Sequence, residues 1–257
     1  ATQISLAILC FALPYKEKFK TFLGLFLPAV YINYVVIGIP LFDAVWGSEN
    51  NAITSVIIMS NDLIIVPVYQ VLTTIYSMMM RNKALSDSDT PKEKITIKTI
   101  LKIILSIFKS PIIQGVIIGI IWSLTTLKLP IYLDKLMQIV AQTIGACALF
   151  CVGGFLAQHS LIACGWDELI IGISFRFIIM PLFGLIFSHV IGLTGTESRQ
   201  ICVMASVTSA LACYPMSVAS KIGESVASTM IFWTTILFVP VIMLWLYVLD
   251  KLNLFIE

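Results

Sequence analysis

The sequence carries little charge. Only 12% of its 257 residues are Asp, Glu, Lys or Arg, whereas 59% are hydrophobic, and its mean hydropathy is +0.99. A soluble domain of this length needs far more charge to cover its surface. The formal net charge of +2 provides no basic footprint for DNA or RNA, so we expect no nucleic-acid partner.

Motifs for metal and nucleotide chemistry are also missing. The sequence has two histidines, no HExxH pattern and no P-loop, so neither a metalloenzyme nor an ATP-driven pump is indicated. Most of the cysteines lie in apolar runs, where a thiol behaves as a small hydrophobic group. They are Cys10, Cys147, Cys151, Cys164, Cys202 and Cys213. We therefore expect no enzymatic activity, no metal site and no cofactor.

Long apolar runs dominate the chain. About 20 consecutive apolar residues cross a bilayer once. Stretches near or above that length follow a shorter run at 1–14, and they lie at about 21–46, 52–80, 110–127, 134–158, 166–193, 199–220 and 225–249. The sequence thus predicts an all-α, multi-pass integral membrane protein. Because the run 1–14 begins at Ala1 without a basic leader, we interpret it as the end of a helix and expect a fragment.

One long polar segment, 81–94, is the natural divider of the chain. After it, Lys94, Lys98 and Lys102 recur at every fourth residue among apolar residues, which predicts a helix lying in the membrane interface. We therefore divide the chain into an incomplete first repeat at 1–80, a cytoplasmic loop with an interfacial helix at 81–109, and a second repeat of five helices at 110–257.

The distribution of basic residues predicts the orientation. The links 15–20 and 81–109 fall on the same side of the membrane by alternation, and they hold ten of the sixteen Lys and Arg residues. We expect these links to be cytoplasmic and the C-terminus to lie on the opposite side.

Paired prolines indicate an internal repeat. Pro40 is followed by Pro67 after 27 residues, and Pro215 is followed by Pro240 after 25 residues. Interrupted helices at matching positions of two inverted repeats are typical of secondary carriers. The alternative is that membrane helices often carry prolines without any repeat.

Polar groups within the apolar spans are the candidate functional residues, since burying them is costly unless they are paired or useful. They are Asn33, Asn61, Asp62, Arg176, Ser206, Thr208 and Ser209.

An interrupted helix exposes backbone N–H groups that suit a carboxylate, and the amide of Asn33 would add a neutral donor. The alternative for Asn33 is a bond to another helix, worth about 0.6 kcal/mol. Asp62 and Arg176 could form a buried ion pair, act as a proton-linked switch, or face a water-filled cavity.

The chain resembles the auxin efflux carrier superfamily, and within it the PIN-FORMED branch with a short central loop. The stretch from Asn33 to Gly47, with Gly38-Ile-Pro40-Leu inside it, matches a signature of that family. Further matches follow in the same order along the chain. They are Gly119 to Leu124, Leu161 to Gly165, Arg176-Phe177 with Pro181, and Gly192 to Gly195.

The resemblance implies ten helices in two inverted five-helix repeats, of which the first two helices are missing here. The fourth and ninth helices of this family are broken and cross at the transport site. By resemblance, Asn33 contacts the substrate carboxylate and Asn61 replaces a substrate-contacting glutamine. The second crossing segment lies at 206–212, with Ser206, Thr208 and Ser209 as candidate contacts. The helix breaks are associated with Gly38, Pro40 and Pro215.

Departures from the family pattern leave the substrate open. Ile32 stands where the family has a proline, and Val66 where it has a tyrosine.

The resemblance implies a homodimeric secondary transporter of the endoplasmic reticulum or plasma membrane. It would export a small organic anion, indole-3-acetate first among candidates, by alternating access. The alternatives are a truncated, non-transporting membrane protein and a carrier of another organic anion coupled to protons or sodium through Asp62.

Overall fold

The computed structural model describes residues 1–47, 52–84, 105, 108–109, 111–125, 129–158, 160–193 and 195–251. Within these ranges the chain is helical and contains no strand, apart from one isolated β-bridge between Ile32 and Ser209. The predicted all-α fold is therefore confirmed.

The helices follow the apolar runs of the sequence. In chain order they are α1 (Thr2–Ala12), α2 (Lys18–Val30), η1 (Tyr34–Gly38), α3 (Ile39–Trp46), α4 (Ala52–Ser60), η3 (Asn61–Ile65), α5 (Val66–Ala84), α7 (Pro111–Leu124), α8 (Ile131–Gln158), α9 (Trp166–Ser174), η5 (Phe175–Ile179), α10 (Met180–Ile191), α11 (Gly195–Ala205), α12 (Cys213–Ser220) and α13 (Glu224–Lys251). In the described residues, three helices are long and apolar enough to cross a membrane, namely Ile53–Lys83, Trp166–Ile191 and Glu224–Lys251.

The chain forms two compact units. The first consists of Ala1–Ile58 and Val140–Glu257, and the second of Met59–Ile139. The division at 81–109 and the inverted symmetry of the repeats stay predictions. The helix predicted from Lys94, Lys98 and Lys102 lies outside the described residues.

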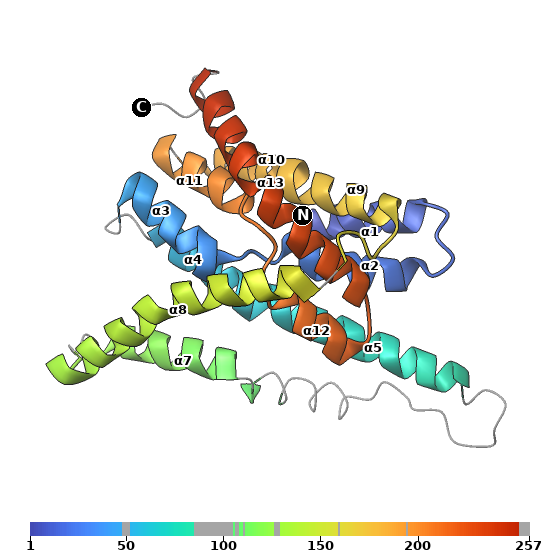
Figure 1. The fold of residues 1–257 in the computed structure, drawn as a ribbon, viewed down its shortest axis with the longest axis horizontal. Coiled ribbons are helices and arrows are strands. Elements are labelled where there is room, and N and C mark those ends of the chain that lie inside the picture. Colours follow the sequence, from blue (N-terminus) through green and yellow to red (C-terminus); the bar gives the residue numbers. More distant parts are fainter. Residues whose placement is uncertain are drawn as a thin grey trace. The chain divides into compact units, whose positions relative to one another are not determined.

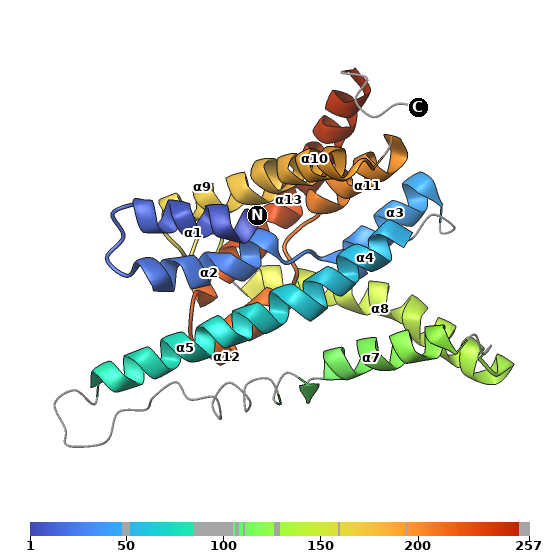
Figure 2. The same cartoon turned by 180° about the vertical axis from the view of Figure 1, so that it is seen from behind.

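Helix α2 is the centre of the first unit. Its residues 22–30 are all buried, since the segment is apolar on every side. It packs against α1, α9 and α13, and these helices run beside it in both ribbon views (Figures 1 and 2). Gly24 of α2 lies against Gly223, in the turn before α13, so closely that a Cβ atom on Gly223 would overlap the Cα atom of Gly24. The backbones therefore touch with no side chain between them.

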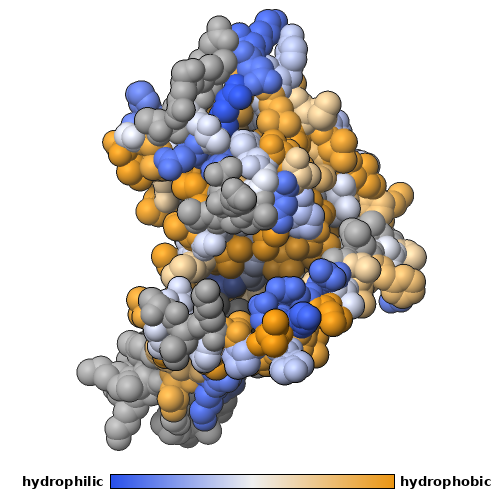
Figure 3. Space-filling model, turned by 90° about the vertical axis from the view of Figure 1, so that its left-hand side faces the viewer, coloured by the Kyte–Doolittle hydropathy of each residue, from blue (hydrophilic) through white to orange (hydrophobic). Residues whose placement is uncertain are grey.

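Apolar side chains also cover much of the outer surface. Figure 3 shows hydrophobic residues over a large part of one face, with polar residues in smaller groups. The exposed side chains include Ile4, Ile8 and Phe150, of which Phe150 is 84% exposed. Such a surface is unfavourable in water and favourable in lipid.

A π-helical turn precedes a proline in each of the long interrupted helices. The turns η1, η3 and η5 end two residues before Pro40, Pro67 and Pro181. Proline has no N–H to donate, and its ring clashes with the carbonyl four residues earlier. A turn with one extra residue accommodates both effects without ending the helix.

A tryptophan satisfies the carbonyl that lies four residues before Pro181. This carbonyl belongs to Phe177, and it accepts the indole N–H of Trp245 from α13 at 2.8 Å. The proline-induced irregularity in one helix is thus stabilised by a side chain of another helix in the same unit.

Candidate functional site

Two helix breaks meet in the first unit. One separates α2 from η1 at residues 31–33, and the other separates α11 from α12 at residues 206–212; together we call them the crossing. The N–H of Asn33 donates to the carbonyl of Thr208 at 2.9 Å, and the N–H of Ala210 donates to the carbonyl of Tyr31 at 3.1 Å. Ile32 and Ser209 lie between these bonds as an antiparallel pair. The unwound segments therefore satisfy each other's backbone groups.

Local sequence explains why the helices end there. The second break contains Ser206, Val207, Thr208 and Ser209, which are hydroxyl-bearing or β-branched and favour non-helical backbone. The first break begins at Tyr31, which is extended with φ −73° and ψ 118°. Each break is followed by a new helix within a few residues, so both spans continue after a short irregular segment.

Arg176 anchors the second break. Its side chain is completely buried in η5, and its Nε donates to the carbonyl of Val207 at 2.6 Å. Its Nη2 donates to the carbonyl of Thr208 at 2.8 Å, and Nη1 lies 3.6 Å from the sulfur of Met180. These carbonyls follow the C-terminal end of α11, where a helix carries partial negative charge that a cation stabilises.

Two hydroxyl groups complete the backbone bonding of the crossing. The Oγ of Ser209 donates to the carbonyl of Pro28 at 2.6 Å. The N–H of Ser209 donates to Oγ1 of Thr234 on α13 at 3.1 Å, and that hydroxyl donates in turn to the carbonyl of Met230 at 2.7 Å. The freed backbone groups of the second break thus find side-chain partners on η5 and α13.

Asn33 and Thr208 keep hydrogen-bonding capacity at the crossing. They are opposite residues across the bridge, and opposite residues of an antiparallel pair carry side chains on the same face. The Oγ1 of Thr208 is buried without a hydrogen-bond partner. Asn33 is 6% exposed, and among the described residues its side-chain amide makes no hydrogen bond. An amide and a hydroxyl with unused donors can bind a carboxylate.

The other predicted residues of the first unit have structural partners. The Oγ of Ser206 donates to the carbonyl of Cys202 at 2.9 Å, within its own helical turn. Gly38 lies against Met204, because a Cβ atom there would be 3.1 Å from the methyl carbon of that side chain. Pro215 lies in the first turn of α12, where a missing N–H costs nothing, whereas Pro40 follows the π turn η1 inside the continuous helix that begins at Tyr34. The breaks themselves lie upstream of these prolines.

Asn61 and Asp62 belong to the second unit. Both are buried in η3, at 1% and 3% exposure. Arg176 belongs to the first unit and uses backbone carbonyls as partners. The roles predicted for Asn61 and Asp62, including a charge pair with Arg176, stay predictions.

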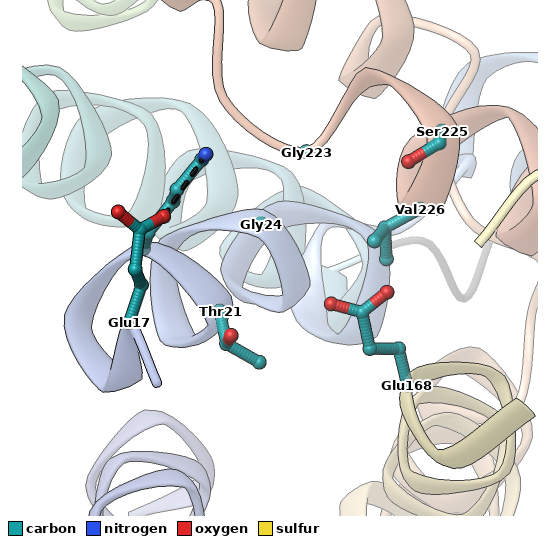
Figure 4. A pocket seen from close by; sticks show the side chains of 8 residues that line it. Glu17, Thr21, Gly24, Glu168, Gly223, Ser225 and Val226 are labelled. Atoms are coloured by element: carbon teal, nitrogen blue, oxygen red, sulfur yellow. Dashed lines mark ion pairs between the residues drawn. The ribbon is translucent and has the colours of Figure 1, made fainter. Parts of the chain in front are cut away.

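Two hollows open in the first unit, one where α2, α9 and α13 begin and the other between the end of α1 and the start of α9. One, of about 240 Å³, is lined by Glu17, Lys20, Thr21, Gly24, Glu168, Gly223, Ser225 and Val226. Figure 4 shows Glu17 on one side of this hollow and Glu168 on the other. Glu17 forms an ion pair with Lys20 at 3.1 Å. Carboxylates in the first turn of a helix offset its partial positive charge, so this cluster has a structural explanation.

The second hollow is apolar. Its volume is about 630 Å³, and it is lined by Leu9, Leu13, Pro14, Tyr15, Asp167, Ile170 and Ile171. Burial raises the pKa of the Tyr15 phenol above its ordinary value, with a further contribution from Asp167.

Sequence reasoning missed two contributors to the crossing. Pro28 supplies the carbonyl that Ser209 binds, and Thr234 supplies the hydroxyl that binds the N–H of Ser209. Thr234 carried a usable signal, because it is a polar residue near the middle of an apolar span. Pro28 carried a weaker one, since its backbone rather than its side chain is used.

Comparison with known proteins is consistent with this geometry. A family model described as membrane transport protein matches residues 2–246. Auxin efflux carrier component 6 of Arabidopsis thaliana is 26% identical over 172 residues, which cover 65% of this chain and 30% of that protein. Auxin efflux carrier component 8 of the same plant is 22% identical over 258 residues, covering 86% of this chain and 69% of that protein.

A rice protein gives a similar result. Probable auxin efflux carrier component 5c of Oryza sativa subsp. japonica is 23% identical over 150 residues, which cover 56% of this chain and 40% of that protein. The chain thus spans between about a third and about two thirds of the length of these relatives.

Proposed function

Because the chain belongs to the membrane transport protein family, we propose that its crossing is the substrate site of a secondary carrier for a small organic anion. The observation that carries this proposal is the pair formed by Asn33 and Thr208. They are opposite each other where two broken helices meet, and their side chains have unused hydrogen-bonding capacity. Carriers commonly bind substrates between interrupted helices near the middle of the bilayer.

The electrostatics of the crossing favour an anion. The helix formed by η1 and α3 begins at Tyr34, directly after Asn33, and the first N–H groups of a helix lack intrahelical partners. That end carries partial positive charge and suits a carboxylate. The opposite type of helix end, after α11, is already covered by Arg176. The crossing therefore presents donors and positive potential, while the carbonyls of Tyr31, Val207 and Thr208 are occupied.

The names of the relatives indicate which anion to test first. They are auxin efflux carriers, so we take indole-3-acetate as the first candidate and export by alternating access as the mechanism. A potential of 100 mV is worth about 2.3 kcal/mol per charge moved, which can drive an anion out of the cytosol without a coupled ion. A homodimer in the endoplasmic reticulum or plasma membrane, with the basic links in the cytosol, completes the proposal.

Substitution of Asn33 tests the proposal. In the full-length protein, Asn33→Ala removes an amide donor next to the start of η1, and we expect binding of indole-3-acetate to weaken at least about tenfold. Radiolabelled efflux from proteoliposomes and equilibrium binding in detergent measure the effect. The matched control is Asn82→Ala, near the C-terminal end of α5, which removes the same amide far along the chain from the crossing.

The outcomes separate a binding role from a structural one. A folded Asn33→Ala protein that has lost affinity, beside an Asn82→Ala protein with normal affinity, supports the proposal. Normal efflux and affinity in the Asn33→Ala protein contradict the assignment of the crossing as the substrate site.

A further inference from the structure

Arg176 is a fully buried guanidinium whose hydrogen-bond partners are uncharged. Its bonds go to the carbonyls of Val207 and Thr208, and its third nitrogen faces the sulfur of Met180. Among the described residues of the first unit, no carboxylate forms an ion pair with it. A buried cation without a counter-charge is unfavourable, so its retention calls for a function.

The carbonyl of Thr208 links this cation to the candidate substrate residue. It accepts the N–H of Asn33 at 2.9 Å and Nη2 of Arg176 at 2.8 Å. A carbonyl oxygen has two lone pairs, so both are in use. One oxygen atom therefore separates the guanidinium from the backbone of Asn33, and no position remains on it for water or a metal ion.

Unwound carbonyls and half-helix C-terminal ends are the groups with which carriers hold a free coupling cation. Here the corresponding carbonyls, after the C-terminal end of α11, hold a side-chain cation instead. The guanidinium cannot dissociate or lose its charge at physiological pH, because an arginine remains protonated in proteins.

We infer that Arg176 is the built-in cation of the crossing. It binds the carbonyls of Val207 and Thr208, which we call the carbonyl cradle of the second break. Its charge, which no carboxylate among the described residues of the first unit balances, makes the site select a monoanion. It acts as a specificity-determining residue through the electric field and through the position of the backbone of Thr208, without touching the substrate. In the low-dielectric interior a charge one carbonyl away acts strongly on a bound carboxylate. The inference rests on the proposed function.

A pair of ligands that differ only in charge tests the charge-selection part. Indole-3-acetate and indole-3-acetamide have nearly the same shape, and the amide is neutral. We expect the full-length wild-type protein to prefer the carboxylate. In Arg176→Gln the ratio of the two affinities should fall about tenfold, whereas Arg176→Lys should keep it within about threefold because the charge remains. The matched control is Arg199→Gln, which removes a partly buried guanidinium paired with Asp250.

The ratio distinguishes charge selection from a purely structural role, which would change both affinities alike. An unchanged ratio in folded Arg176→Gln, or a ratio lost in folded Arg176→Lys, overturns the inference while the carrier assignment stands. If Arg176→Gln does not fold, the Lys variant decides by the same ratio. A wild-type protein that binds neither compound overturns the proposed function instead.

A second measurement tests the cradle without any substrate. Removing the side chain in Arg176→Ala leaves the carbonyls of Val207 and Thr208 open to a small planar cation. Millimolar methylguanidinium should therefore raise the unfolding temperature of Arg176→Ala more than that of the wild type, with sodium chloride at equal concentration as the reference. If methylguanidinium shifts the unfolding temperature of both proteins equally, or shifts neither, the inference is overturned whatever the substrate is.

Discussion

The hydroxyl of Ser209 donates a hydrogen bond of 2.6 Å to the carbonyl oxygen of Pro28, 181 residues earlier in the chain. This carbonyl lies in the last turn of α2, where helix ends leave carbonyls without intrahelical partners. Ser209 therefore acts as a C-terminal cap supplied from a distant part of the sequence. The cap and the bridge hydrogen bonds hold the two breaks together independently of any ligand.

Ser209→Ala should destabilise the protein by about 1–2 kcal/mol, because it leaves the buried carbonyl of Pro28 without its donor. The measurement is the free energy of unfolding in mixed micelles as a denaturing detergent is added. Ser188→Ala is the control, since the Oγ of Ser188 donates at 2.9 Å only to the carbonyl of Leu185 in its own helix. Equal losses in the two variants would show that the cap has no special importance.

Trp245→Phe should cost about 1–2 kcal/mol of unfolding free energy, because the carbonyl of Phe177 loses the indole N–H that it accepts at 2.8 Å. The aromatic ring remains, so little packing is lost. Trp233→Phe is the control: its indole N–H donates to the exposed carbonyl of Leu161 at 2.9 Å, and water can replace it. The same unfolding assay compares them, and a neutral Trp245→Phe would refute this role of the tryptophan.

Gly223→Ala should be the most destabilising of these changes, at about 3 kcal/mol. The new Cβ atom would overlap the backbone of Gly24, and the residue has a φ of +69° that an L side chain adopts at a cost. Gly192→Ala separates the two effects, because Gly192 has a φ of +79° with nothing within 4 Å. That control should lose only about 1 kcal/mol. Similar thermal shifts for both variants would mean that the backbone contact does not matter.

The sequence predicted the helices because a bilayer imposes a simple rule. Every backbone group must be satisfied within the segment, so a long apolar run becomes a helix. Burial of Asn33, Thr208 and Arg176 also followed from their position in apolar runs. What the runs could not show is which polar groups pair, because partners such as Ser209 and Pro28 are distant in sequence.

The role of Arg176 shows this limit well. The charge of Asp62 made an ion pair an obvious hypothesis, since opposite charges are the first partners to consider. The partners that the structure shows for Arg176 within the first unit are the backbone carbonyls of Val207 and Thr208, and a pairing with Asp62 stays a prediction. Carbonyls become available only where a helix is interrupted, and the exact residues at which it unwinds depend on the other helix at the crossing. No single segment of the sequence contains that information.

The π turn at Phe175–Ile179 shifts the buried positions after it by one residue along the sequence. Gly172 is buried before the turn and Pro181 after it, nine residues later, followed by Leu185 and Ser188 at ordinary helical spacing. A regular helix would return to the same face after about seven or eight residues. The extra residue is equivalent to a one-residue insertion in the middle of a membrane span. A homologue without it needs a compensating one-residue gap in its alignment to keep both halves of the span on the same core.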